Sequence, residues 1–203
     1  MRVTTGRLRG RRIRVPPGRE VRPTTDHARR AVFDILSHDS PRLVGARFLD
    51  VFAGSGAVGL EAWSRGARRV VLLERAPEVL AAIRHNLRDL PAGADIELRV
   101  ADATRPGRAP HPFDIVFLDP PYRSGLAGPA LTALLGEGWI APGARVVVEL
   151  ARTEDPPELP DLAVEDIRRY GPSRFVFLRR ISGAGSPGPG RGRREGGGDA
   201  VGG

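Results

Sequence analysis

Short runs of Val, Ile and Leu that alternate with helical patterns are the feature that most restricts the fold of this chain. Five such runs occur between Arg47 and Leu150, and stretches with apolar residues at helical spacing lie among them. Strands that are apolar along their whole length are typical of a parallel sheet with helices on both faces. The pattern therefore predicts a doubly wound, Rossmann-like α/β domain. The strand-like runs are RFLDVF (47–52), RVVLLE (69–74), IELRVAD (96–102), FDIVFLD (113–119) and RVVVEL (145–150).

The last two apolar segments predict a different connection. LAVEDIRRYG (162–171) and SRFVFLRR (173–180) are separated by a short turn around Gly171 and Pro172, which is too short for a helical crossover. They should form an antiparallel hairpin, so the sheet should end in an antiparallel C-terminal strand. Residues 182–203 are rich in Gly, Pro and Arg and have little to bury, which predicts a disordered tail.

The N-terminal part has its own pattern. Residues 2–15 predict two short basic strands around Gly6 and Gly10, and apolar residues at helical spacing predict a helix from about His27 to Ser37. We expect three parts: a basic N-terminal hairpin and helix (1–40), an α/β domain (41–181) and the tail (182–203).

The charge of the chain is strongly positive and unevenly distributed. Its net charge is +8, and all 32 basic residues are arginine. A GC-rich genome could raise the arginine content everywhere, but ten arginines lie between Arg2 and Arg30 against two acidic residues. This asymmetry favours a polyanionic partner that contacts the N-terminal segment. The candidate RNA-binding residues are Arg7, Arg9, Arg11, Arg12 and Arg14.

Several classes of protein are disfavoured by what the sequence lacks. It contains no apolar run long enough to cross a bilayer, and no apolar region follows the first charges, so we expect a cytoplasmic protein without a membrane partner. Cysteine is absent and the four histidines are scattered. We therefore expect neither a disulfide framework nor a bound metal.

A glycine-rich loop predicts a nucleoside-binding site. Gly54, Gly56 and Gly59 form a G-x-G-x-x-G pattern between a predicted strand and a predicted helix. Glycines in this position let main-chain N–H groups approach a ligand at the start of the helix. Glu74 ends the next predicted strand, where it could accept hydrogen bonds from ribose hydroxyls.

The acids around the loop favour S-adenosylmethionine as the cofactor. Asp50 precedes Gly54 by four residues, and a carboxylate there would repel a pyrophosphate but suits an ammonium and a sulfonium. Alternatively, Asp50 is a structural acceptor for loop amides. Asp102 and Ala103 follow the third predicted strand, where the carboxylate and the amide could receive an adenine ring, although Asp102 could equally be a helix cap.

The segment DPPY (119–122) predicts the catalytic elements. Asp119 follows an apolar strand, and the prolines after it restrict the main chain, so the Asp119 carboxylate and the Pro120 carbonyl form two fixed acceptors. Two acceptors on the hydrogens of an exocyclic amine stabilise the positive charge that grows on its nitrogen during methyl transfer. Tyr122 could stack on the base, which must leave its helix or be unpaired to reach the site. An incidental acid before a Pro-Pro turn is the alternative, which the nearby glycine loop disfavours.

These motifs resemble a known family. LDVFAGSGAVGLEAWSRGA and FDIVFLDPPY are similar to class I S-adenosylmethionine-dependent methyltransferases that act on amines. With GRLRGRRIRVPPG and RPTTDHARRAVFDIL, the resemblance over residues 2–180 is to the RsmD family of bacterial 16S rRNA guanine-N2 methyltransferases. The usual helix motif is altered at two positions, with His27 where Arg is common and Arg30 where Glu is common.

The resemblance implies a monomeric enzyme with a seven-stranded sheet that methylates one guanine of 16S rRNA, in the 30S subunit or an assembly intermediate. It implies that Asp119, Pro120 and Tyr122 are the catalytic elements. The cofactor contacts that it implies are Asp50, Gly54, Gly56, Glu74 and Asp102, with Arg22 and Thr24 near the cofactor or the target base.

Three other functions stay open at this point. DPPY suits the N6 amine of adenine in DNA or RNA as well as guanine N2. A basic RNA-binding assembly factor without catalysis is a second possibility, disfavoured by the intact Asp119 and glycine loop. A nicotinamide dehydrogenase is disfavoured by Asp50 and leaves DPPY without a role.

Overall fold

A computed structural model of the chain describes residues 1–15, 25–88, 90–91 and 95–181. The strands are β1 (Arg47–Val51), β2 (Arg69–Glu74), β3 (Ile96–Val100), β4 (Phe113–Leu118), β5 (Ile140–Ala151), β6 (Leu162–Tyr170) and β7 (Ser173–Arg180). The helices are η1 (Gly6–Leu8, a 3-10 turn), α1 (Thr25–His38), α2 (Ala57–Ser64), α3 (Pro77–Arg88) and α4 (Ala127–Gly136).

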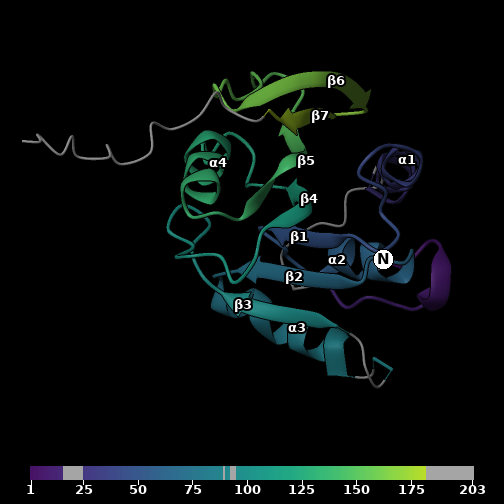
Figure 1. The fold of residues 1–203 in the computed structure, drawn as a ribbon. Helices are drawn as coiled ribbons and strands as arrows, with labels where there is room; N and C mark the ends of the chain where they lie inside the picture. Colours follow the sequence, from purple (N-terminus) through teal and green to yellow (C-terminus); the bar gives the residue numbers. More distant parts are fainter. Residues whose placement is uncertain (16–24, 89, 92–94, 182–203) are drawn as a thin grey trace, which may run out of the picture.

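The seven strands form one sheet in the order β3-β2-β1-β4-β5-β7-β6 (Figure 1). Neighbouring strands from β3 to β5 are parallel, and β7 is antiparallel to both β5 and β6. The predicted doubly wound sheet and its antiparallel C-terminal strand are confirmed. The order of the strands reverses between β1 and β4, and ligands of such sheets bind at the carboxyl ends of the strands beside this point.

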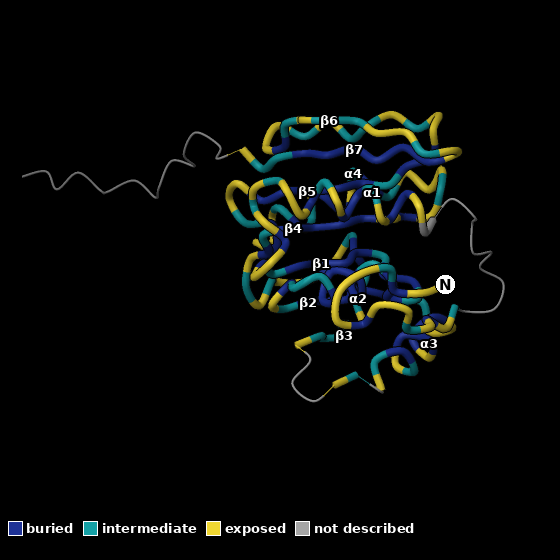
Figure 2. Tube along the Cα trace, turned by 90° about the vertical axis from the view of Figure 1, so that its right-hand side faces the viewer, coloured by how far each residue is buried: buried dark blue, intermediate teal, exposed yellow. Residues whose placement is uncertain are grey.

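Helices lie on both faces of the sheet, as the apolar strands predict. Successive residues of β1 enter opposite layers: Phe48 packs in a core with α1 and α2, whereas Leu49 packs in a second core with α4. Both side chains are completely buried. Figure 2 shows buried main chain along β4, β5 and β7 and more exposed residues along the edge strand β6. The strands are apolar throughout because each face has its own core.

The C-terminal hairpin is also confirmed. β6 and β7 pair from Leu162 with Arg180 to Tyr170 with Ser173, and Gly171 turns the chain between them with a φ of 56°. The predicted helix near residues 27–37 is α1, which begins at Thr25 and ends at His38. The tail predicted for residues 182–203 lies outside the described residues.

Residues 1–15, which we call the N-terminal arm, form a hairpin-like loop and not the predicted pair of regular strands. Arg2 and Arg12 make one antiparallel bridge, and η1 occupies the bend. The bend contacts α2 closely, since a Cβ atom built on Gly6 would lie 1.9 Å from the carbonyl oxygen of Ser64. Such contact requires a glycine and replaces strand pairing with packing on a helix. The arm side chains Val3, Leu8 and Ile13 are buried in the same core as α1 and α2. Because the arm and α1 share this core with α2, the domain boundary expected at residue 40 stays a prediction.

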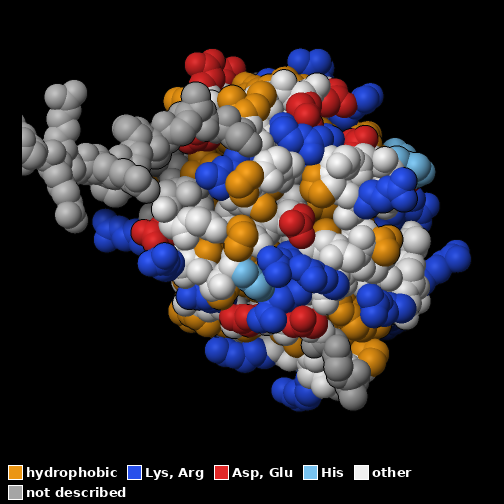
Figure 3. Space-filling model, in the orientation of Figure 1, with side chains coloured by type: hydrophobic (Ala, Val, Ile, Leu, Met, Phe, Trp, Pro, Cys, Tyr) orange, Lys and Arg blue, Asp and Glu red, His pale blue; other side chains and the backbone are white. Residues whose placement is uncertain are grey.

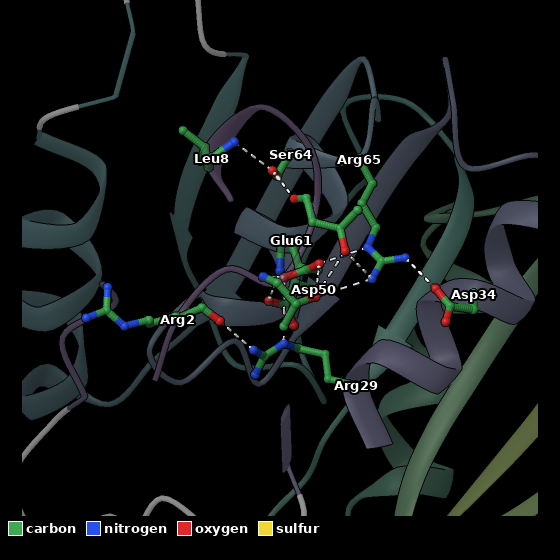
Figure 4. A network of polar contacts seen from close by, with 11 residues as sticks. Arg2, Leu8, Arg29, Asp34, Asp50, Glu61, Ser64 and Arg65 are labelled. Atoms are coloured by element: carbon green, nitrogen blue, oxygen red, sulfur yellow. Dashed lines mark hydrogen bonds and ion pairs between the residues drawn. The ribbon is translucent and has the colours of Figure 1, made fainter. Parts of the chain in front are cut away.

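A buried carboxylate on α2 anchors the arm (Figure 4). Glu61 is completely buried and accepts hydrogen bonds from the Thr4 amide at 2.7 Å and the Thr4 hydroxyl at 2.6 Å. Its other contacts are the guanidinium groups of Arg65 at 2.8 Å and Arg29 at 3.9 Å. Ser64 adds a second anchor, because its hydroxyl accepts a bond from the Leu8 amide at 2.9 Å. These contacts hold the arm, α1 and α2 together.

We predict that Glu61→Ala lowers the free energy of unfolding by about 3 kcal/mol, because it leaves the Thr4 amide without its acceptor and takes one buried carboxylate partner from Arg29 and Arg65. Urea denaturation followed by circular dichroism measures this loss. Glu158→Ala is the matched control, since it removes the same charge from an exposed loop residue. Equal stability of the two variants would contradict the role of Glu61 as an anchor.

Candidate active site at the carboxyl ends of β1, β2 and β4

Three of the acids predicted from the sequence lie at or near the carboxyl ends of neighbouring strands. Asp50 lies on β1, Glu74 ends β2, and Asp119 directly follows β4. β1 pairs with β2 on one side and with β4 on the other, so the loops after these strands are neighbours. The Asp119 amide donates to the Val51 carbonyl at 3.3 Å, which continues the β1–β4 pairing up to the DPPY segment. The glycine loop and DPPY therefore lie side by side.

The glycine loop has the strained main chain expected of a ligand-binding turn. Gly54 and Gly56 have positive φ values of 58° and 76°, and Phe52 has a φ of 61°, which is unfavourable for an aromatic residue. Gly56 is the N-cap of α2. Gly59 lets α2 approach the sheet, because a Cβ atom there would lie 2.2 Å from Leu72. Main-chain conformation or close packing thus explains why each of the three positions is a glycine.

Glu74 joins the end of β2 to the glycine loop. Its Oε2 accepts a hydrogen bond from the Gly54 amide at 3.0 Å, and its Oε1 accepts bonds from the Arg75 and Ala76 amides at 2.8 and 2.9 Å. Three main-chain donors therefore fix the carboxylate beside the loop. Carboxylate oxygens have further lone pairs, so the group can still accept hydrogen bonds from ligand hydroxyls.

Asp50 holds the first turn of α2. The side chain is buried, and its Oδ2 accepts a hydrogen bond from the Gly59 amide at 2.8 Å. Loss of hydration in this buried position raises the pKa of Asp50 well above its ordinary value, and the neighbouring Glu74 adds to the rise, whereas the Gly59 bond lowers it. This is the structural-acceptor role weighed above, and the cofactor contact that the resemblance implies for Asp50 stays a prediction.

Asp102 opens a turn after β3 and does not cap a helix. Its Oδ1 accepts hydrogen bonds from the Thr104 amide and hydroxyl at 2.9 and 2.8 Å, and its Oδ2 pairs with Arg75. Hydrogen bonds from the Thr104 amide and hydroxyl lower the pKa of Asp102, and Arg75 lowers it further. Ala103 is buried behind this turn. Arg75 and Thr104 are partners of Asp102 that the sequence analysis missed.

The DPPY segment is fixed by contacts with the C-terminal part of the sheet. Asp119 is exposed, Pro120 is buried, and Tyr122 is partly exposed. The Tyr122 hydroxyl lies 2.7 Å from the Ser173 hydroxyl and donates to the Glu149 carboxylate at 3.2 Å. Ser173 also donates to Glu149, at 2.8 Å. Glu149 and Ser173 were missed, although a carboxylate within the apolar run RVVVEL was a signal.

The basic arm reaches the glycine loop through one amide side chain. Asn86 of α3 is buried, and it accepts a hydrogen bond from the Arg14 amide at 2.8 Å. Its Nδ2 donates to the Arg14 carbonyl and to the Ser55 carbonyl of the glycine loop, each at 2.9 Å. The arm is thereby tied to the candidate cofactor site.

The arginines of the arm lie largely in solvent. Arg7, Arg9, Arg12 and Arg14 are exposed, Arg11 is partly exposed, and Arg7 lies over the Trp63 ring at 4.0 Å. The two other expected contacts, Arg22 and Thr24, lie outside the described residues.

Within the described part of the chain, no helix is both long and apolar enough to cross a membrane. The same residues contain no group of three or more His, Asp or Glu side chains that could hold a metal ion.

We predict that Asp50 gives the protein an unusual pH dependence of stability. Its raised pKa means that the folded state retains the Asp50 proton to higher pH than the unfolded state, so folding loses stability as pH rises from the unfolded pKa of about 3.9 towards the folded value. Asp50→Asn removes this group. The free energy of unfolding of the wild type, relative to the variant, should fall as the pH rises above about 4 in urea denaturation. A pH-independent difference would contradict the raised pKa.

The sequence matches the family model described as "Conserved hypothetical protein 95" over residues 1–179. The chain is 39% identical over 149 residues to the ribosomal RNA small subunit methyltransferase D of Escherichia coli K12, covering 73% of this chain and 74% of the relative. It is 31% identical over 185 residues to the putative rRNA methyltransferase YlbH of Bacillus subtilis, covering 89% and 99% of the two chains.

A solved structure agrees with these matches. The putative methyltransferase yhhF from Escherichia coli superposes with a TM-score of 0.76 at 34% identity, over 90% of this chain and 98% of the other. The resemblance inferred from the sequence motifs is thus confirmed over nearly the whole described chain, and the chain belongs to the RsmD family of ribosomal RNA methyltransferases.

Proposed function

We propose that this protein transfers a methyl group from S-adenosylmethionine to the exocyclic N2 amine of a guanine in 16S rRNA. The observation that carries the proposal is the position of Asp119. It is exposed at the carboxyl end of β4, followed by two prolines, and lies beside the glycine loop that follows β1. The names of the family members, which specify small subunit rRNA, support the substrate.

The cofactor would bind over the glycine loop. The loop fits such a ligand for two reasons. Its glycines with positive φ lie at the start of α2, where main-chain amides can donate to a ligand. Acidic residues also stand at the end of β2 and just after β3. S-adenosylmethionine supplies an electrophilic methyl group on a sulfonium. Asp50 holds the start of α2 through the Gly59 amide, and the main-chain amide of Ala103, next to Asp102, would contact the adenine ring. The residues that would hold the cofactor are Gly54, Gly56, Glu74, Asp102 and Ala103, with Asp50, Arg22 and Thr24 as the remaining proposed contributors.

The target amine would be held by the DPPY segment. The Asp119 carboxylate and the Pro120 carbonyl accept the two hydrogens of the amine, which directs the nitrogen lone pair towards the methyl donor. These acceptors stabilise the positive charge on the nitrogen until its proton leaves, and they need little reorganisation because the prolines restrict the main chain. Tyr122 would stack on the flipped guanine.

The N-terminal arm would bind the phosphate backbone around the target. Its exposed arginines suit phosphate oxygens, and Asn86 holds the arm at a fixed place relative to the glycine loop. We further propose that the enzyme acts as a monomer in the cytoplasm, on the 30S subunit or an assembly intermediate. The proposed phosphate contacts are Arg7, Arg9, Arg11, Arg12 and Arg14.

The decisive experiment uses labelled S-adenosylmethionine and 30S particles from cells that lack the modification. We expect the wild type to methylate one guanine at N2, located by mass spectrometry of the rRNA. Asp119→Ala should reduce turnover about 100- to 1,000-fold, because it removes a preorganised acceptor, while calorimetry should show a similar affinity for S-adenosylmethionine. A methylated adenine, or no methylation, would refute the proposed substrate. Near-normal turnover of the Asp119 variant would refute the mechanism.

A second prediction concerns the hydroxyl of Tyr122. Tyr122→Phe keeps the ring but removes its contacts with Ser173 and Glu149, so kcat/KM should fall about tenfold. Tyr122→Ala should cost more, because stacking contributes a further 1 to 3 kcal/mol by rough estimate. Ser173→Ala removes one of the same contacts from the other side, so its kcat/KM should fall as that of Tyr122→Phe does. If Tyr122→Phe is as active as the wild type, the hydroxyl contacts do not position the ring.

A further inference from the structure

A groove between α3 and β3 lies outside the candidate active site. It has a volume of about 430 Å³, within the range of small-molecule pockets. Leu87, Leu98 and Val100 contribute its apolar surface, and Arg84 and Arg88 its polar groups. Val100 is 55% exposed, which is unusual for a strand residue that faces a helix. The groove therefore offers an apolar surface with two cations beside it.

The two arginines of the groove are available to a ligand. Arg84 and Arg88 are exposed, and neither has an ion-pair or hydrogen-bond partner among the described residues. They are four residues apart on α3, so they lie on the same side of the helix, one turn apart. Figure 3 shows arginine side chains, with acidic side chains among them, over the lower part of the molecule, which α3 and β3 occupy in Figure 1. This surface suits an anion that extends along the helix.

Helix α3 connects the groove with the N-terminal arm. Asn86, which binds the arm, and Leu87, which lines the groove, are about 100° apart around the helix. The arm and the groove thus lie on different flanks of α3, and Arg84 and Arg88 are on the side of the helix away from Asn86. A chain with repeated negative charges could contact Arg14, cross the outer face of α3 and reach the groove.

We propose that the α3–β3 groove is a second RNA-binding surface, which takes a nucleotide flanking the target. Its phosphate would bind Arg84 and Arg88, and its base or ribose would pack on Leu87, Leu98 and Val100. The proposal rests on the proposed function, because it assumes an RNA substrate. RNA is the occupant that the charges favour, since a nucleotide combines a ring that can pack on apolar side chains with an anionic phosphate that arginines bind.

The test compares Arg84→Gln/Arg88→Gln with Arg168→Gln/Arg169→Gln. The control removes two exposed arginines from β6, at the opposite edge of the sheet. The substrates are unmethylated 30S particles and naked 16S rRNA. We expect the groove variant to raise the KM for particles about tenfold with unchanged kcat. It should also reduce the slope of log K against log salt for both RNAs by about 0.7, because the two arginines bind one phosphate and each phosphate contact contributes about 0.7. Val100→Ser should raise KM without changing the slope.

Each other outcome has a distinct meaning. If the wild type does not methylate the particles, the proposed function fails, and the groove is judged from binding to naked 16S rRNA alone. If the wild type is active and the groove variant matches the control in KM and salt slope, the groove proposal is overturned. A variant that loses affinity for particles but binds naked rRNA normally would also overturn it, because the groove would then contact a ribosomal protein.

Discussion

The hydrogen bond between the Gly59 amide and the buried Asp50 carboxylate joins the first turn of α2 to β1, and most of the proposed functional parts contact α2. Its N-terminus carries the glycine loop, while Glu61 and Ser64 further along the helix hold the N-terminal arm and α1. A buried carboxylate is costly without hydrogen-bond partners. Asp50 and Glu61 each meet this need by binding main-chain amides of another segment, and in doing so they join the two segments. One short helix thus sets the positions of the cofactor loop and the basic arm.

The fold was predictable because its signals are local. Runs of β-branched and Leu residues indicate strands, and a short turn between two such runs permits only antiparallel pairing. The glycine loop and DPPY were recognisable for the same reason. The arm was harder, because Gly6 approaches Ser64, which is 58 positions further along the chain, and this contact replaces the expected strands with a bend. No local pattern encodes such a contact.

The contacts that position the site were mostly not predictable. Asn86, Glu149 and Ser173 act through partners that are distant in sequence, and their spacing carries no signal. Asp50 shows a related limit, because an acid near a glycine loop suggested ligand binding, and the sequence carries no sign of its hydrogen bond with the Gly59 amide of α2. The sequence therefore predicted which segments form the site better than it predicted what each side chain contacts. The segment around Arg22 and Thr24 stays a prediction.

The amide of Asn86 has a consequence for how the two substrates influence each other. It bonds both the arm at Arg14 and the glycine loop at Ser55, so fluctuations of the two segments are restrained by one side chain. A ligand that orders either segment lowers the entropy cost of ordering the other. Any such gain is reciprocal: the factor by which RNA tightens cofactor binding equals the factor by which the cofactor tightens RNA binding. With the proposed roles of the arm and the glycine loop, Asn86 would link recognition of the rRNA thermodynamically to binding of the methyl donor.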